Sequence, residues 1–476
     1  CEARVRRAST SRRARGLRRQ ASFSTRVDAF ERAAAEDFDF SESVQTCVDP
    51  DELLKLAGTV GKMDPDELDA MMGSFGGLEE ALEDIDGAEA SSPSADKPDV
   101  DDPGRMDVIN EVLMQSGSVV FSRPSSCGQG QIVVRAIRAR REHAENICAD
   151  VRNLEHQWRT MQFVGDRGAF PSREGKVRDI VKGVVRVAMP PAVQGGGEGA
   201  APTMVTEVLA SGHAKSCVAT ALAAAQACGA DLLREGGPPP RALIIGLGAG
   251  CIPAWLVDRF PRLVCDAVEV DSVVAVAAVE AMGLPVEATI TPSGAAAAAE
   301  EAVRGCGGRL RVHVCAGEDF VSELAKAAPE EFRYDLVILD CACPDLPEPM
   351  AQHGGPFLQA LAALLRPCAG VAVSTLVAAD GQGTVSGSTP PATDVAQAFH
   401  DAAGGEAFMT RTPILETANA MHTILGFSTQ PVGDRDGENL QDALKRSAAH
   451  VGWFVNSSFN LARRLDDGFK EVGGDS

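Results

Sequence analysis

The chain has 476 residues, 45% of them hydrophobic, and a formal net charge of −22, which supports at least one large core and excludes a wholly disordered protein. The acidic balance argues against nucleic acid as the partner, because phosphates are bound by basic surfaces, and it favours a basic protein or an amine. No run of 18 apolar residues occurs, so we expect no membrane-spanning helix and no membrane partner.

The first 27 residues are rich in Arg and Ser and contain a single acidic residue, Glu2. This composition is typical of an organelle transit peptide, which would direct the chain to a mitochondrion or a plastid. A disordered basic tail and a nuclear-type signal are the alternatives, and without a transit peptide we expect a cytoplasmic protein. The chain begins with Cys1 rather than Met, which is consistent with a fragment or a processed form.

Residues 28–105 form a strongly acidic region. The motif DPDEL occurs in it twice, at Asp49–Leu53 and Asp64–Leu68, and each copy is expected to start a short helix, because Asp is a good N-cap and Pro a good first helical residue. The remainder, ending in the stretch Gly87–Gly104, has the composition of a disordered linker.

Residues 106–235 are interpreted as a globular N-terminal extension of a catalytic domain. The expected elements, in chain order, are a helix at 106–117, a strand at 118–123, a long helix at 131–158, a β-hairpin at 176–190 and an Ala-rich helix at 204–229.

Residues 236–476 alternate apolar strands with helices, which predicts an α/β fold with a doubly wound, mostly parallel sheet. Including two late strands, the sheet has seven strands. The strands are expected at 241–247, 265–271, 309–315, 334–340, 370–376, 407–415 and 422–430, and the main helices at 252–260, 272–283, 318–327 and 357–366.

A ligand of such a sheet binds outside the carboxyl ends of its strands. The first strand is followed there by Gly246, Gly248 and Gly250 in the motif GLGAG. Glycines in this place allow a tight turn and a close approach of the backbone to a ligand, next to the amides of the following helix. A merely structural strand–helix turn is the alternative.

Glu269 ends the second strand, 19 residues after Gly250, where a carboxylate can accept hydrogen bonds from both hydroxyls of a ribose. Both nicotinamide cofactors and S-adenosylmethionine carry such a ribose. Cys251 stands where the dinucleotide motif has its third small residue, so the loop favours S-adenosylmethionine. For Asp271 we favour a role as the N-cap of the next helix.

Two further strand ends carry candidate residues. After the third strand, Gly317 permits close approach to an adenine ring, and Glu318 or Asp319 can accept a hydrogen bond from its amino group; capping the next helix is the alternative role of both acids. Asp340 ends the apolar fourth strand, where a partly desolvated carboxylate would guide an acceptor amine or face the sulfonium. Its alternative role is to hold the adjoining loop.

Together, these residues make the stretch from Arg159 to the C-terminus resemble the spermidine-synthase-like class I methyltransferases, which have a Rossmann-like fold. Within that group it is most similar to the C-terminal domain of the elongation factor 1-alpha lysine and N-terminal methyltransferases. The motifs are RTMQF (159–163), LASGHAKSCVATAL (209–222), LIIGLGAGCIPAWL (243–256), VEVD (268–271), RLRVHVCAGEDF (309–320), YDLVILDCACPD (334–345), LLRPCAGVAVSTL (364–376) and ANAMHTILGF (418–427).

The resemblance implies a site for each part of S-adenosylmethionine. The loop Gly246, Leu247, Gly248, Ala249 and Gly250 would hold the methionine part, Glu269 the ribose, and the segment Gly317, Glu318 and Asp319 the adenine. Asp340 would be the catalytic residue, and His213 matches a histidine that the family carries near the cofactor mouth. Ala316 departs from the family, which often has an acidic residue there.

The predicted function is transfer of a methyl group from S-adenosylmethionine to an amine nitrogen, of a lysine or an N-terminal amine of a protein. A polyamine aminopropyltransferase is one alternative, but Cys343 stands where those enzymes place a second Asp. A binding module without catalytic activity is the other. The 13 cysteines include no CxxC pair, which indicates reduced thiols inside the cell and predicts no metal site.

Overall fold

A computed structural model describes the chain from residue 117 onward with gaps, and these residues belong to one compact unit, Asp66–Ser476. The described ranges are 117–128, 130–138, 154–164, 180–190, 201–285, 289–291, 294–305, 308–341, 348–378, 392–413, 420–432, 438–457, 459–466 and 468–472. The predicted tail at 1–27, the acidic region at 28–105 and the predicted helix before Gly117 lie outside them, as does Cys343.

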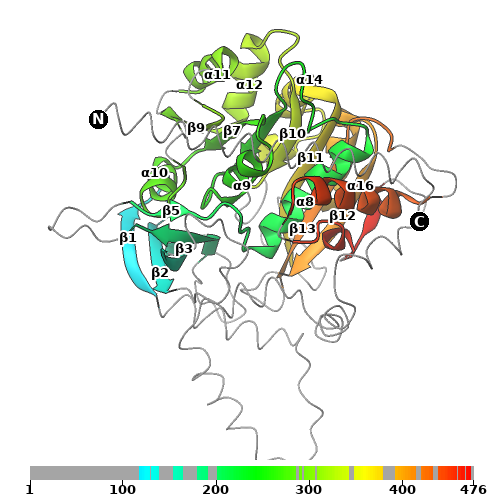
Figure 1. Ribbon diagram of the computed structural model, residues 1–476. Helices are drawn as coiled ribbons and strands as arrows, with labels where there is room; N and C mark the ends of the chain where they lie inside the picture. The colour runs from blue at the N-terminus through cyan, green and yellow to red at the C-terminus, as the bar shows by residue number, and fades with distance from the viewer. Residues whose placement is uncertain are drawn as a thin grey trace, which may run out of the picture. The chain divides into compact units, whose positions relative to one another are not determined.

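The first part of the described chain forms an antiparallel sheet of five strands in sequential order. Its strands are β1 (Ser118–Pro124), β2 (Gln131–Arg138), β3 (Glu155–Val164), β4 (Ile180–Met189) and β5 (Thr203–Met204). The strand predicted at 118–123 is confirmed by β1. Figure 1 shows this sheet as the cyan to dark green strands at the beginning of the coloured chain.

Two predicted elements of this region are wrong. The long helix predicted at 131–158 is replaced at both ends by β2 and β3, which pair with each other. Ile132, Val134 and Ala136 are buried at a spacing of two residues, which is the strand period, so pairing overrides the local helical pattern. The hairpin predicted at 176–190 is the single strand β4, in which Gly183 lies beside an irregularity in the pairing with β3 rather than in a turn.

The second sheet has nine strands in the described part of the chain, in the order β14-β12-β13-β11-β10-β6-β7-β9-β8. The strands from β8 to β11 along this order run parallel, and β13, β12 and β14 continue the sheet in antiparallel pairings. Their bounds are β6 Arg241–Ile245, β7 Val264–Glu269, β8 Thr289–Thr291, β9 Leu310–Val314, β10 Tyr334–Leu339, β11 Leu365–Ala378, β12 Ala407–Pro413, β13 Ala420–Ser428 and β14 Lys470–Val472.

Helices pack against this sheet in two separate apolar cores. α8 (Gly212–Ala227), α9 (Cys251–Arg259), α10 (Ser272–Glu280) and α16 (Leu440–Phe454) contribute to the first core, together with the antiparallel sheet and the short helix η1 (Arg463–Leu465). α11 (Ala295–Arg304), α12 (Gly317–Ala327), α13 (Glu348–Ala351), α14 (Pro356–Leu364) and α15 (Ala392–Ala403) contribute to the second. Figure 1 shows α11, α12 and α14 apart from α8 and α16.

Strand β6 illustrates why the parallel strands appear in the sequence as continuous apolar runs. Ala242 and Ile244 belong to the first core, and Leu243 and Ile245 belong to the second, so both faces of the strand are buried. The predicted α/β class is therefore confirmed, with a mixed sheet of nine strands where seven were expected. The predicted Ala-rich helix is α8, but it begins only at Gly212.

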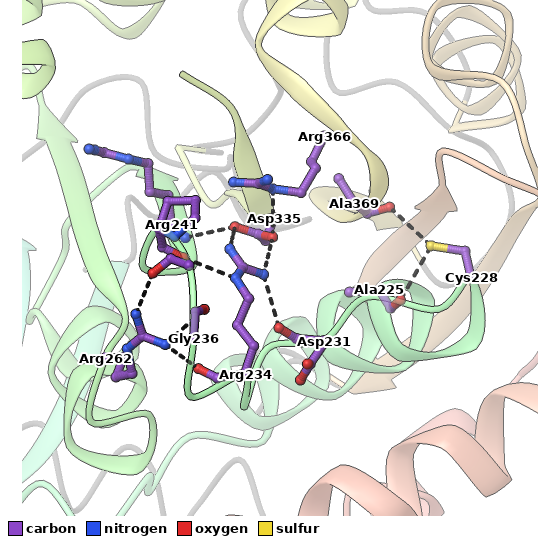
Figure 2. Close-up of polar contacts among 12 residues, drawn as sticks. Ala225, Cys228, Asp231, Arg234, Gly236, Arg241, Arg262, Asp335, Arg366 and Ala369 are labelled. Atoms are coloured by element: carbon purple, nitrogen blue, oxygen red, sulfur yellow. Dashed lines mark hydrogen bonds and ion pairs between the residues drawn. The ribbon is translucent and has the colours of Figure 1, made fainter. Parts of the chain in front are cut away.

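At the amino-terminal edge of the parallel strands, the buried carboxylate of Asp335 binds the first residue of β6 and the segment that leads into it. Asp335 in β10 is fully buried and accepts two hydrogen bonds from Arg234, at 3.0 and 3.2 Å, and one from the backbone N–H of Arg241 at 2.9 Å. It also forms an ion pair with Arg366 at 2.8 Å, and Figure 2 shows these side chains converging on it. These arginine side chains therefore stabilise the fold.

A second buried network lies within the sheet. Asp266 accepts hydrogen bonds from Arg311 at 2.7 Å and from the phenol of Tyr334 at 3.0 Å, and it is 2.9 Å from His313. Burial alone would raise the pKa of Asp266, but the hydrogen bond with His313 and the charge of Arg311 lower it. These four side chains are fully buried, so this charged cluster also serves the fold.

Asp271 ties the antiparallel sheet to the parallel one. It is the N-cap of α10, as predicted, and accepts a hydrogen bond from the N–H of Val273 at 2.8 Å. The same carboxylate accepts hydrogen bonds from the hydroxyls of Ser125 and Ser126, in the turn after β1. Burial by itself would raise the pKa of Asp271, but these hydrogen bonds lower it.

We expect Asp271→Ala to lower the free energy of unfolding by about 2–3 kcal/mol, since a cap is worth about 1 kcal/mol and the serine hydroxyls lose a charged acceptor. Asn439→Ala is the matched control, because Asn439 caps α16 through the N–H of Asp442, and its side-chain bonds among the described residues stay within that helix. Its expected cost is about 1 kcal/mol. Urea unfolding followed by circular dichroism measures the loss of unfolding free energy in both variants. Equal losses would contradict the role of Asp271 in joining the two sheets.

Candidate active site

The carboxyl ends of four neighbouring strands, β9, β7, β6 and β10, meet at one edge of the sheet. Each is followed by predicted site residues: β6 by the loop Gly246–Gly250, β9 by Gly317 at the start of α12, and β10 by Asp340, while Glu269 is the last residue of β7. The structure therefore brings these residues, far apart in the sequence, to a common edge.

The loop after β6 requires glycine. Gly246, Gly248 and Gly250 have φ angles of 94°, 51° and 78°, a region that other residues rarely adopt. A Cβ on Gly246 would lie 2.2 Å from the carbonyl oxygen of Asp340, and one on Gly250 would lie 2.7 Å from a methyl group of Leu284. The first glycine thus lets the loop pass directly over the end of β10.

The rest of the loop leads into α9, whose N-cap is Gly250. Pro253 lies in the first turn of α9, where no backbone N–H is required of it. The amides of Gly248 and Ala249 find no acceptor among the residues that the structure describes. From the other side, Gly183 of β4 packs on the loop so closely that an added Cβ would be 2.6 Å from the Cβ of Ala249. The antiparallel sheet thus covers the loop.

Glu269 is buried, and both its oxygens accept hydrogen bonds from backbone amides. One oxygen binds the N–H of Leu247 in the glycine loop at 3.0 Å, and the other binds the N–H of Asp271 at 3.0 Å. These two bonds fix the orientation of the carboxylate at the end of β7. Glu269 thereby couples the ends of β6 and β7.

His213 and Asp340, 127 residues apart in the sequence, form a short polar contact at this edge. His213 is the second residue of α8, and its Nε2 lies 2.7 Å from Oδ1 of Asp340, with the two side chains 17% and 26% exposed. Burial alone would lower the pKa of His213, but the negative charge of Asp340, together with Cys217, raises it well above its ordinary value.

Three thiols lie close to this pair and remain protonated. Burial, reinforced by the charge of Asp340, raises the pKa of Cys251 and of Cys341 to about 12. Burial also raises the pKa of Cys217, whose sulfur is 3.7 Å from Nε2 of His213. These three thiols therefore add no negative charge to the site.

The segment predicted to bind adenine, Gly317–Asp319, follows β9 and lies at the same edge. A Cβ on Gly317 would lie 2.4 Å from Ile245, so this glycine lets α12 start directly against the end of β6. Ala316 is the N-cap and makes no side-chain hydrogen bond to the helix. Glu318 is half-buried and Asp319 exposed in the first turn of α12, where their charges favour the helix dipole.

Sequence reasoning missed three contributors to this edge. Cys217 is an i+4 neighbour of His213 on α8, a spacing that the helix periodicity contains. Gly183 contacts the glycine loop from β4, which the sequence pattern assigns to a hairpin, and Ser125 and Ser126 bind Asp271 from the turn after β1. Both contacts depend on the tertiary fold.

Comparison with known proteins gives two curated relatives. The chain is 29% identical over 110 residues to the mouse protein named eEF1A lysine and N-terminal methyltransferase, covering 23% of this chain and 12% of the relative. It is 27% identical over 151 residues to the human protein of the same name, covering 30% of this chain and 18% of the relative. These matches confirm the predicted resemblance, over a small part of the relatives' length. No family model matches the chain.

Among solved structures, the chain is similar to a probable spermidine synthase from Corynebacterium glutamicum, with a TM-score of 0.36, 15% identity and coverage of 58% of this chain and 92% of that chain. It is also similar to human methyltransferase-like protein 13 in complex with SAH, with a TM-score of 0.35, 20% identity and coverage of 52% and 93%. No helix in the described ranges has the length and apolar character that crossing a membrane requires.

Proposed function

We propose that the chain is an S-adenosylmethionine-dependent methyltransferase that acts on an amine nitrogen of a protein, either a lysine or an N-terminal amine. The observation that carries this proposal is the meeting of the glycine loop, Glu269 and Asp340 at one strand edge, with Glu269 bonded directly to the loop. The two curated relatives support it, because their name describes lysine and N-terminal methylation of eEF1A.

The residues at the edge suit this cofactor chemically. Gly246–Gly250 would hold the methionine part, where a side chain would collide and where the amides of Gly248 and Ala249 are left to a ligand. Glu269 offers a fixed carboxylate to the two hydroxyls of a ribose. Gly317, Glu318 and Asp319 would line the adenine site. When bound, the cofactor supplies an activated methyl group on a sulfonium.

Asp340 is proposed to receive the acceptor. An incoming lysine or terminal amine is a cation, so the carboxylate attracts it, and the amine must lose its proton before it can attack. His213 keeps one oxygen of Asp340 engaged at 2.7 Å, which orients the second oxygen. The protein must in addition align the amine with the methyl group and exclude water. Good alignment of two reactants can lower the activation barrier by roughly 7–11 kcal/mol.

The nature of the acceptor is proposed from charge. With a net charge of −22, the chain attracts a basic protein surface and repels polyanions, which speeds encounters at low ionic strength. A protein acceptor also agrees with the names of the two relatives.

Two measurements test the function. Calorimetry with S-adenosylmethionine should show binding of one equivalent, and incubation with labelled cofactor and a cell extract should label a basic protein on nitrogen, as identified by mass spectrometry. Labelling of putrescine by the decarboxylated cofactor instead would favour aminopropyl transfer. Absence of cofactor binding would refute the enzyme and leave a binding module.

Glu269→Gln should weaken S-adenosylmethionine binding about ten- to hundredfold, since hydrogen bonds to a charged group are worth roughly 1.5–3 kcal/mol. The new amide would also place a donor against the N–H of Leu247 or of Asp271, both of which need an acceptor. Glu280→Gln is the control, because Glu280 is an exposed residue of α10 whose carboxylate forms an ion pair with the exposed Arg123. Equal affinities in calorimetry would remove Glu269 from the cofactor site.

A further inference from the structure

Three potential metal ligands of different chemistry converge beside the proposed reaction centre. A ring nitrogen of His213, the sulfur of Cys217 and a carboxylate oxygen of Asp340 all lie within 4.8 Å of one another. His213 and Cys217 are four residues apart on α8, so one helix face presents both side chains, and Asp340 follows the buried strand β10. The site is thus held by two rigid elements.

The spacing of the three ligand atoms, all within 4.8 Å of one another, is close to that around a single small ion. Ligands at about 2.0–2.3 Å from a tetrahedral zinc ion lie roughly 3.3–3.6 Å from one another. The sulfur of Cys217 is 3.7 Å from Nε2 of His213, and Nε2 is 2.7 Å from Oδ1 of Asp340. When an ion replaces the proton shared by His213 and Asp340, Nε2 and Oδ1 must move apart by about half an ångström. We expect a change in the side-chain torsions to accommodate this movement.

We propose that His213, Cys217 and Asp340 form a binding site for a zinc ion. An imidazole, a thiolate and a carboxylate are the ligand types that zinc accepts, whereas magnesium and calcium prefer oxygen ligands alone. Binding of the ion displaces the thiol proton of Cys217 and the proton shared by His213 and Asp340. The resulting neutral imidazole and two anions balance the two positive charges of the ion, which suits a largely buried place. The described residues supply three ligands, and a tetrahedral zinc ion takes a fourth.

The site has a consequence for the proposed function. A bound ion occupies the oxygen of Asp340 that faces α8 and neutralises the carboxylate that attracts the acceptor cation. Zinc is therefore an inhibitor that competes with the amine at Asp340. Binding of the ion is independent of the proposed function, whereas this inhibition rests on it.

Zinc binding is measured on the full chain, without S-adenosylmethionine, by competition with a chromophoric chelator. The wild type should take zinc from the chelator, and magnesium and calcium should have no effect. Cys217→Ser, which nearly preserves volume, should weaken zinc binding at least tenfold, and His213→Ala should do the same. Cys228→Ser is the matched control at the other end of α8, and it should bind zinc as the wild type does.

Thermal melts of each variant establish that it is folded. Equal zinc affinity in the wild type, Cys217→Ser and His213→Ala would overturn the site, as would the absence of any zinc uptake by the wild type. Failure of methyl transfer with intact zinc uptake would refute the proposed function and leave the metal site standing. Zinc uptake without loss of measured methyl transfer would overturn the inhibition.

Discussion

Gly246→Ala is expected to abolish S-adenosylmethionine binding and to destabilise the fold by about 2–5 kcal/mol. The φ angle of 94° is unfavourable for alanine, and its Cβ would lie 2.2 Å from the carbonyl oxygen of Asp340, which is backbone and cannot rotate away. Relief requires the loop to lift from the end of β10, which would displace the amide of Leu247 from Glu269. Calorimetry and urea unfolding measure the two effects.

A graded series separates this effect from general sensitivity to alanine. Gly236→Ala is the control, because an added Cβ there meets nothing within 4 Å, and we expect less than about 0.5 kcal/mol. Gly250→Ala is intermediate, since its φ is 78° but its Cβ would meet only the side chain of Leu284. If Gly246→Ala does not fold, Gly250→Ala still carries the test. Wild-type binding by both loop variants would contradict the proposed cofactor loop.

The parallel part of the fold follows from the sequence because its signals are local. Strands such as Arg241–Ile245 and Tyr334–Leu339 are apolar on both faces, and the helices between them begin at recognisable residues such as Asp271. Topology then places the ends of the parallel strands at one edge without further information. For this reason the sequence alone predicts that the glycine loop, Glu269 and Asp340 lie at one edge of the sheet, as the structure shows.

The antiparallel sheet is not predictable in the same way. The segment from Gln131 contains a strand pattern and a helical pattern at once, and its pairing with Glu155–Val164 decides between them. Edge strands added beyond the expected seven, Thr289–Thr291 and Lys470–Val472, are three residues each and carry too little pattern. The cover that Gly183 places on the glycine loop depends on this sheet and is therefore invisible in the sequence.

Asp340→Asn is expected to lower kcat for methyl transfer by about 10²–10⁴-fold, the usual contribution of a group that handles a proton in the transition state. Asparagine keeps the size of the side chain and an oxygen that can accept a hydrogen bond from His213. We therefore expect the fold and the arrangement of the strand ends to be retained. What is lost is the charge that attracts the acceptor cation and can take its proton. S-adenosylmethionine affinity should therefore change much less than kcat.

The control for this substitution is an exposed histidine–aspartate pair in the same chain. His353 and Asp401 are 2.7 Å apart but more than 40% exposed, so Asp401→Asn should leave methyl transfer unchanged. Because the charge of Asp340 raises the pKa of His213, the substitution should also move the titration of His213 to lower pH, as followed by NMR in the presence of a chelator. A lowered titration with unchanged kcat would make Asp340 a partner of His213 and not the catalytic group.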